Sequence, residues 1–287
     1  MERFIRLLKI LLVRKVAERA HHLVSESRKT GDHMMVLYLL ANEMKSLGPE
    51  LSAYLLREIL VKAGKRLPGY GEFLHHVGDV RALASFAGND FMSALLQKSR
   101  RMQMDEVTEL LASTPPQRKI YHSEDVETRA PVQDYVPLGV RKSLARRPDI
   151  QTIENLVSEQ DPSVVRHLLT NPRFTEEMVV KMASLRPTSE AVLEEIFISQ
   201  RWSSRYRIRK ALVFNPYTPP RITNALLPML VIQDLMDIAV SRTLHSIVRR
   251  SAKRIIINRV AEMGRAEKQE FNRVYGNRLK NIFVRVG

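Results

Sequence analysis

Few residues of this chain have the type and spacing that catalysis requires. Asp234 and Asp237 stand in an otherwise basic stretch, where two carboxylates could act as catalytic acids on nucleic acid. Caps and ion pairs with neighbouring arginines are the commoner role of such residues, and we favour that interpretation. Asp105, Glu106 and Glu109 share the start of an expected helix, where carboxylates favour the helix dipole rather than forming an acid–base pair.

The sequence offers no convincing metal or cofactor site. Its histidines include two adjacent pairs, His21-His22 and His75-His76. Neighbours on a helix point about 100° apart, so neither pair can chelate one metal from a regular helix. The absence of cysteine excludes disulfides, thiolate zinc sites and cysteine-held iron–sulfur clusters. Gly69-Tyr70-Gly71 lacks the third glycine and the lysine of a phosphate-binding loop. We therefore predict no metal, no cofactor, no small-molecule substrate and no enzymatic activity.

Charge is the stronger signal. The net charge is +15, and residues 201–287 carry 18 Lys/Arg against 5 Asp/Glu, whereas residues 31–200 carry 20 against 23. A positive charge of this size favours an anionic partner. The classes of partner that fit are an acidic protein, nucleic acid and anionic lipid. The alternative is that these charges form a solvated surface that keeps the protein in solution and binds no partner.

The first basic cluster, residues 201–210, has aromatic residues between its cations. Arginine neutralises phosphates, and exposed aromatic rings stack on bases. Trp202 and Tyr206 are therefore possible stacking residues, although a lone tryptophan more often lies in a core. The candidate binding residues of this cluster are Arg205, Arg207, Arg209 and Lys210.

The second basic cluster is better organised. On a helix over residues 242–256, Leu244, Ile247, Val248 and Ile255 share one face, so packing and charge do not compete for positions. Arginine binds carboxylates and phosphates alike, so this stripe suits an acidic protein or a phosphate backbone. The candidate binding residues on the opposite face are Arg242, Arg249, Arg250, Lys253 and Arg254.

Recurring polar–proline pairs in the second half of the chain indicate which helices position these residues. Four polar–proline pairs, each followed by a capping residue, mark helix ends because the residue before proline avoids the α conformation. Repeated stops at short spacing predict a stack of short helix pairs. The pairs and their caps are Arg147-Pro148 with Asp149, Asn171-Pro172 with Thr175, Arg186-Pro187 with Thr188, and Asn215-Pro216 with Thr218.

Two of these segments resemble known repeats. Residues 171–175 and 215–220, each followed by a leucine-rich helix, look like the bacterial leucine-rich-repeat-variant and HEAT-like families. The resemblance covers roughly residues 139–258 and implies a right-handed stack of short helices. A DNA glycosylase is one known use of a HEAT-like scaffold, and it is the enzyme class to which Asp234 and Asp237 would belong. Some leucine-rich-repeat-variant proteins also hold an iron–sulfur cluster through cysteines. This chain has no cysteine, so that feature of the family cannot apply to it.

Composition changes along the chain predict its organisation. Residues 1–112 form an N-terminal helical region that begins with one amphipathic helix, residues 113–137 form a linker, and residues 138–287 form the repeat array with its basic C-terminal part. The first helix packs on its neighbours or on a partner, or residues 1–29 meet an anionic membrane surface. No apolar run spans a bilayer and no signal peptide is evident, so we expect a cytoplasmic protein.

These observations predict an all-α protein, an α-α superhelix of HEAT-like repeats with an N-terminal helical region. The expected function is that of a non-catalytic scaffold or adaptor that binds an acidic partner, first of all a protein, through residues 201–259. Nucleic-acid binding is the alternative function, and a DNA-acting enzyme is the third.

Overall fold

The all-α prediction is confirmed. In the computed structural model, residues 2–119 and 136–284 are described, with side chains from residue 14 onward except those of residues 281, 283 and 284; these residues form helices and no strand. They belong to two units. Unit 1 comprises residues 1–113, 224–236 and 250–287, and unit 2 comprises residues 114–223 and 237–249. Most of the expected linker, residues 120–135, lies outside the described residues.

The expected array of residues 138–287 is not a single unit, because its last part packs with the N-terminal region. Arg259 gives the physical reason. Its buried guanidinium donates to the carbonyl oxygens of Gly64 at 2.8 Å, Leu230 at 2.8 Å and Pro228 at 2.6 Å. A buried cation must find acceptors, and here they come from segments far apart in sequence.

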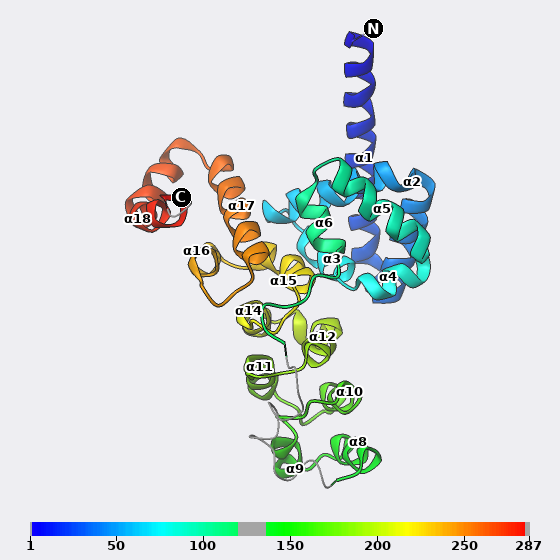
Figure 1. Cartoon of the computed structure of the whole chain (residues 1–287), viewed down its shortest axis with the longest axis vertical. Helices are drawn as coiled ribbons and strands as arrows, with labels where there is room; N and C mark the ends of the chain where they lie inside the picture. Colours follow the sequence, from blue (N-terminus) through cyan, green and yellow to red (C-terminus); the bar gives the residue numbers. More distant parts are fainter. Residues whose placement is uncertain (1, 120–135, 285–287) are drawn as a thin grey trace. The chain divides into compact units, whose positions relative to one another are not determined.

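Unit 1 is built around one helix, on which five others pack (Figure 1). The centre is α2 (His33–Gly64), and its neighbours are α1 (Glu2–Thr30), α3 (Tyr70–Val77), α4 (Val80–Ala87), α5 (Asn89–Arg101) and α6 (Asp105–Leu111). A kink lies inside α2 at Gly48-Pro49, where Gly48 has φ 74°. A positive φ interrupts the helical hydrogen bonds, and glycine adopts it without steric cost.

The second half of α1 packs on α2. Val16, Ala20, Leu23 and Val24 are buried there, at helical spacing. The side chains of residues 2–13, on which the expected membrane contact depends, lie outside the described ones. Within the described part of the chain, every helix is too short or too polar to cross a bilayer.

Three helices are shared between the units. The chain crosses the division inside α15 (Pro220–Leu226), α16 (Ile232–Val240) and α17 (Ser246–Glu262). The short 3₁₀ helix η1 (Leu227–Met229) and the last helix, α18 (Arg265–Val284), belong to unit 1.

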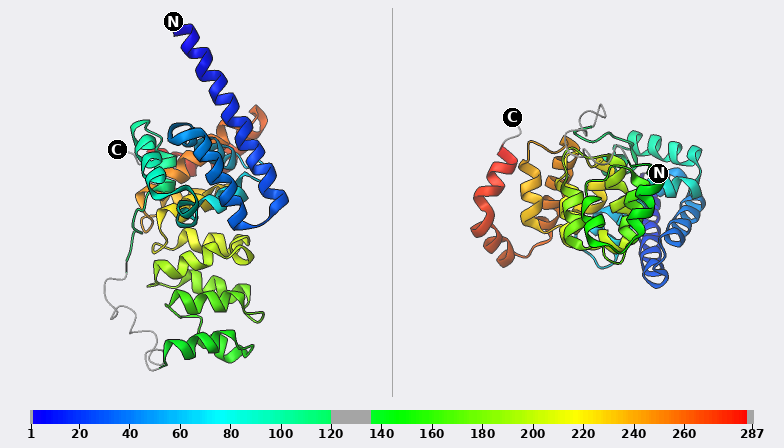
Figure 2. Two further views of the ribbon diagram at one scale, coloured as in Figure 1. Left: turned by 90° about the vertical axis from the view of Figure 1, so that its right-hand side faces the viewer. Right: turned by 90° about the horizontal axis from the view of Figure 1, so that it is seen from below.

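Unit 2 is a stack of short helices in two columns. Figure 1 shows α8, α10 and α12 in one column and α9, α11 and α14 in the other, and the left view of Figure 2 shows the successive layers. The predicted stops are confirmed, since a helix ends two or three residues before each marked proline. The helices are α8 (Leu138–Arg146), α9 (Ile150–Asn155), α10 (Pro162–Thr170), α11 (Glu176–Ser184), α12 (Glu190–Ile198), α13 (Gln200–Ser203) and α14 (Tyr206–Phe214).

The two asparagine–proline marks also join one layer to the next. The side-chain nitrogen of Asn171 donates to the carbonyl oxygens of Ala145 at 2.8 Å and Arg147 at 2.9 Å, at the end of α8. Asn215 repeats this arrangement at the end of α11, with Ala183 at 2.8 Å and Leu185 at 3.0 Å. Each buried amide thus satisfies two carbonyls that a helix end leaves without partners.

A second hydrogen bond fixes each of these asparagines to its own loop. The side-chain oxygens accept from the backbone nitrogens of Arg173 and Tyr217, two residues later. The asparagine therefore holds the turn that follows its helix as well as the end of the neighbouring helix. We call this repeated arrangement the asparagine clamp.

The expected caps are partly right. Asp149 and Thr175 accept hydrogen bonds from Thr152 N and Met178 N at the starts of α9 and α11. Thr188 is replaced in this role by Ser189, which caps α12.

Candidate functional site

Trp202, an expected stacking residue, belongs to the core of unit 2. It is 2% exposed, its indole nitrogen donates to Leu169 O at 2.7 Å, and its ring stands perpendicular to that of Phe174, with the ring centroids 6.2 Å apart. The guanidinium groups of Arg201 and Arg205 lie 4.6 and 5.1 Å from the ring centroid. The tryptophan is therefore covered by cations of its own chain and cannot stack on a base.

Two arginines of the first basic cluster form ion pairs with α11. Arg205 Nη1 lies 2.6 Å from Glu176 Oε2, and Arg207 Nη1 lies 2.8 Å from Glu177 Oε1. The hydrogen bond from Arg207 lowers the pKa of Glu177. An acidic partner would have to displace these carboxylates, so this part of the predicted surface is already engaged.

The other predicted residues of the first cluster have local roles. Arg209 Nε donates to Ser203 O at 2.7 Å, and its Nη2 donates to Ser204 O, so the side chain turns back onto the end of α13. Lys210 is exposed, with its ammonium 5.8 Å from the centroid of the Phe214 ring, and Tyr206 is half-buried.

The second cluster does not form the single stripe that was expected. Arg242 precedes α17, which begins at Ser246, and it belongs with Arg249 to unit 2. Arg250, Lys253 and Arg254 belong to unit 1. Within the described residues, the buried Nε of Arg249 has no hydrogen-bond acceptor.

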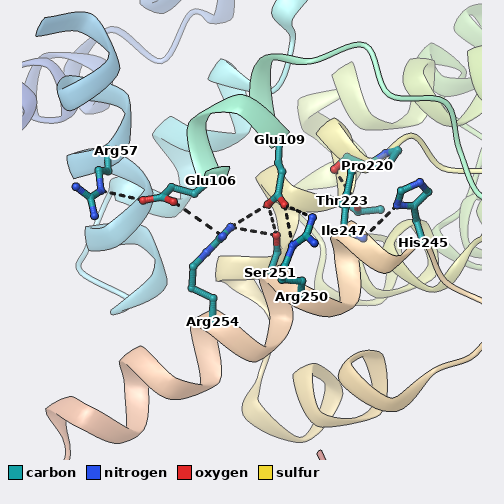
Figure 3. A network of polar contacts seen from close by, with 10 residues as sticks. All are labelled: Arg57, Glu106, Glu109, Pro220, Thr223, His245, Ile247, Arg250, Ser251 and Arg254. Atoms are coloured by element: carbon teal, nitrogen blue, oxygen red, sulfur yellow. Dashed lines mark hydrogen bonds and ion pairs between the residues drawn. The ribbon is translucent and has the colours of Figure 1, made fainter. Parts of the chain in front are cut away.

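Arg250 and Arg254 converge on one buried carboxylate (Figure 3). Glu109 of α6 is 6% exposed. Its Oε1 accepts from Arg250 Nε at 3.2 Å and Nη2 at 2.9 Å. Its Oε2 accepts from Ser251 Oγ at 2.9 Å and Arg254 Nη2 at 3.1 Å. The carboxylate is fully satisfied, so the pairs hold α17 to α6 within unit 1.

The network continues to α2 with an excess of positive charge. Arg57 Nε donates to Glu106 Oε1 at 2.9 Å, and Arg254 Nη1 lies 3.9 Å from Glu106 Oε2 (Figure 3). Three guanidinium groups therefore face two carboxylates. The spacing of Glu106 and Glu109, and of Arg250 and Arg254, already indicated one helix face each. The pairing of segments about 140 residues apart had no signal in a single sequence.

The two candidate catalytic aspartates lie three residues apart on α16. Asp234 is buried in the first turn of α16 in unit 1, whereas Asp237 is exposed and belongs to unit 2. Each has an interaction partner within the chain.

A histidine cluster in unit 1 was missed. His33 Nδ1 lies 2.8 Å from His76 Nδ1, and His33 Nε2 lies 3.1 Å from Asp79 Oδ2, so a chain of hydrogen bonds joins α2 to α3 and to the start of α4. Burial, and then the charge of His33, lower the pKa of His76 to about 4. In the described part of the chain, no group of three or more acidic or histidine side chains is arranged to hold a metal.

A cationic cluster at the first layers of unit 2 was also missed. Arg146 Nη2 donates to His167 Nε2 at 2.9 Å. Burial, and then the charges of Arg146, Lys142 and Arg166, lower the pKa of His167, so this imidazole stays neutral among three cations. Glu195 pairs with Arg166 at 2.5 Å. The sequence does carry a signal for this cluster, because basic residues precede the leucines of α8 and α10.

Comparison with known proteins adds no relative: no family model matches the sequence, and no curated protein or solved structure is significantly similar to it.

Proposed function

We propose that the protein is a non-catalytic, cytoplasmic scaffold whose unit 2, a HEAT-like helical-repeat array, binds an acidic segment of a partner protein. The layered helices and the asparagine clamps support the assignment to a repeat array. Such stacks present extended surfaces to other chains, which favours binding over catalysis.

The cluster of Lys142, Arg146 and Arg166 around His167 carries the proposal. Burial, and then the charges of these three cations, lower the pKa of the imidazole, and the acidic neighbour Glu195 is engaged by Arg166. Among the described residues Lys142 interacts electrostatically with Asp161 and Arg146 donates to His167, so the carboxylates of a partner would compete with an internal carboxylate at Lys142 but meet an imidazole at Arg146. For this reason we assign the contact to α8 and α10 rather than to residues 201–259, where Arg205 and Arg207 are already paired.

The test is affinity purification of the tagged full chain from its host, with and without nuclease treatment. We compare the wild type with a Lys142→Glu, Arg146→Glu variant, which should reduce recovery of the partner about tenfold or more, because like charges now face each other. The control is a Lys15→Glu, Lys181→Glu variant, which makes the same charge change at two other exposed lysines.

A partner that survives nuclease, is lost from the first variant and is kept by the control supports the proposal. Equal recovery by all three proteins would contradict it. Loss after nuclease treatment would favour the alternative function, nucleic-acid binding, which should then weaken steeply with added salt.

A further inference from the structure

We infer that unit 1 contains a binding site for a small amphipathic anion, a carboxylate or phosphate attached to an apolar body. The site is a cavity of about 420 Å³ lined by residues of α2, α6, η1 and α17 and by Asn224. A cavity of this size lies within the range of small-molecule sites. It is independent of the function proposed for unit 2.

One part of the lining is apolar. Leu60 and Val61 of α2, Pro228 of η1 and Ile255 of α17 contribute to it. Gly64 also borders the cavity, and a Cβ at this position would lie at ordinary contact distance, 4.0 Å, from Ile255 Cγ1. Contact with the hydrocarbon body of a ligand would remove this apolar surface from water, which favours binding.

The charged part of the lining has an unbalanced cation. Arg57, Arg254 and Glu106 border the cavity at one place, and Lys65 and Glu262, paired at 2.8 Å, border it at another. Arg254 is held in position by the buried Glu109, as described above, so its orientation is fixed before any ligand arrives. Counted together, the cavity-lining groups carry one positive charge in excess, which favours an anionic head group.

A buried amide adds a second indication of a ligand. Asn224 is 5% exposed and lines the same cavity, yet neither its side-chain nitrogen nor its oxygen has a hydrogen-bond partner among the described residues. Buried polar groups are normally paired. A polar group of a ligand beside the anionic head would supply the missing partner after a rotation of this side chain.

The experiment is calorimetric titration of the full chain with four probes that share an eight-carbon chain: octanoate, octyl phosphate, octanol and octylammonium. We expect saturable binding of one or both anions, and binding of octanol and octylammonium roughly tenfold weaker or more, because only the anions reach the excess guanidinium charge. Comparison of octanoate with octyl phosphate distinguishes the two head groups.

Two variants locate the binding. Ala261→Trp should fill the rim of the cavity and abolish binding, whereas Ala266→Trp, on an exposed position of α18 outside the lining, should leave it unchanged. Arg57→Gln, at a half-exposed side chain, should weaken anion binding several-fold and leave the thermal unfolding temperature unchanged. This variant locates the binding even if the tryptophan variant unfolds.

Three results would overturn the inference. They are no saturable binding of either anion, equal binding of octylammonium, and binding that survives both Ala261→Trp and Arg57→Gln. None of these outcomes depends on partner recovery by unit 2, so failure here and failure of the proposed function are separable.

Discussion

At the scale of single residues, the contact between His33 and His76 makes the molecule sensitive to acid. The two Nδ1 atoms lie 2.8 Å apart, and burial, followed by the charge of His33, opposes protonation of His76. The pKa of His76 is about 4 in the folded chain and near 6.5 when unfolded. The unfolded chain therefore binds more protons in this window, and stability falls as the pH falls from about 6.5 to about 4.

We predict that His76→Gln flattens this dependence. The variant should be less stable than the wild type near neutral pH, because it loses the stacked pair. Between about pH 7 and pH 4, the wild type should lose on the order of 2 kcal/mol more than the variant. Urea unfolding at three pH values measures the difference, and parallel curves would show that His76 does not titrate in this window.

The same cluster shows what residue patterns can and cannot reveal. The 100° separation correctly argues against chelation by His75 and His76 alone, but His33 comes from a helix about 43 residues earlier. Trp202 was uncertain for a related reason. A basic, aromatic decapeptide looks the same whether its indole is packed against Leu169 or exposed to a base.

Glu109 offers a second test at this scale. Glu109→Leu in the full chain should destabilise it by about 2 kcal/mol, because Arg250, Ser251 and Arg254 lose charge-assisted hydrogen bonds. Glu50→Leu, at an exposed glutamate with a 3.5 Å pair to Lys98, should change the free energy of unfolding by less than about 1 kcal/mol. Equal effects of the two substitutions would mean that the buried network adds nothing.

At the scale of elements, the asparagine clamps should carry much of the cohesion between layers of unit 2. We predict that Asn171→Ala and Asn215→Ala each destabilise the chain by about 2–3 kcal/mol, since each leaves two carbonyls of a helix end unsatisfied. Asn277→Ala, at an exposed position of α18, is the control and should change stability by less than about 0.5 kcal/mol. Chemical denaturation measures all three, and a cost at Asn171 no larger than that at Asn277 would contradict the role of the clamp.

Helix ends were the most predictable feature of the elements. The conformational restriction before proline is local, so α8, α10, α11 and α14 end where the sequence indicates. The use of two of the four marks as clamps is not local, because Asn171 and Asn215 reach carbonyls 24 to 32 residues earlier. Asparagine instead of arginine before the proline was the only available signal.

At the scale of the whole molecule, unit 1 is discontinuous, and this has a consequence for fragments. A fragment of residues 1–113 retains Glu109 but loses Arg250, Ser251, Arg254 and the Arg259 contacts. We predict that it melts without a cooperative transition, as followed by circular dichroism, whereas the full chain melts cooperatively.

Glu109→Leu should have opposite effects in the two contexts. In the fragment the substitution removes a carboxylate that has lost its partners, so it should raise the helical circular-dichroism signal at a given temperature, although it lowers the stability of the full chain. Destabilisation in both contexts would show that the partners of Glu109 lie elsewhere.

Composition predicted the fold class but not this division. Net charge counts cations without regard to what they face, and the basic C-terminal third turned out to supply internal pairs to both units. The positive charge on which our proposal depends lies instead at α8 and α10. Acidic residues elsewhere in residues 31–200 cancel it, so the net charge of that region does not reveal it.

The asparagine clamp also bears on how this chain would age chemically. Deamidation of asparagine usually begins when the backbone nitrogen of the next residue attacks the side-chain amide, but the next residues here are Pro172 and Pro216, which have no N–H. The competing route, in which the amide nitrogen attacks its own main-chain carbonyl and cuts the chain, requires a nitrogen that both Asn171 and Asn215 already commit to two neighbouring carbonyls. The two side chains that join the layers are thereby protected from both of the spontaneous reactions that shorten the lifetime of asparagine in proteins.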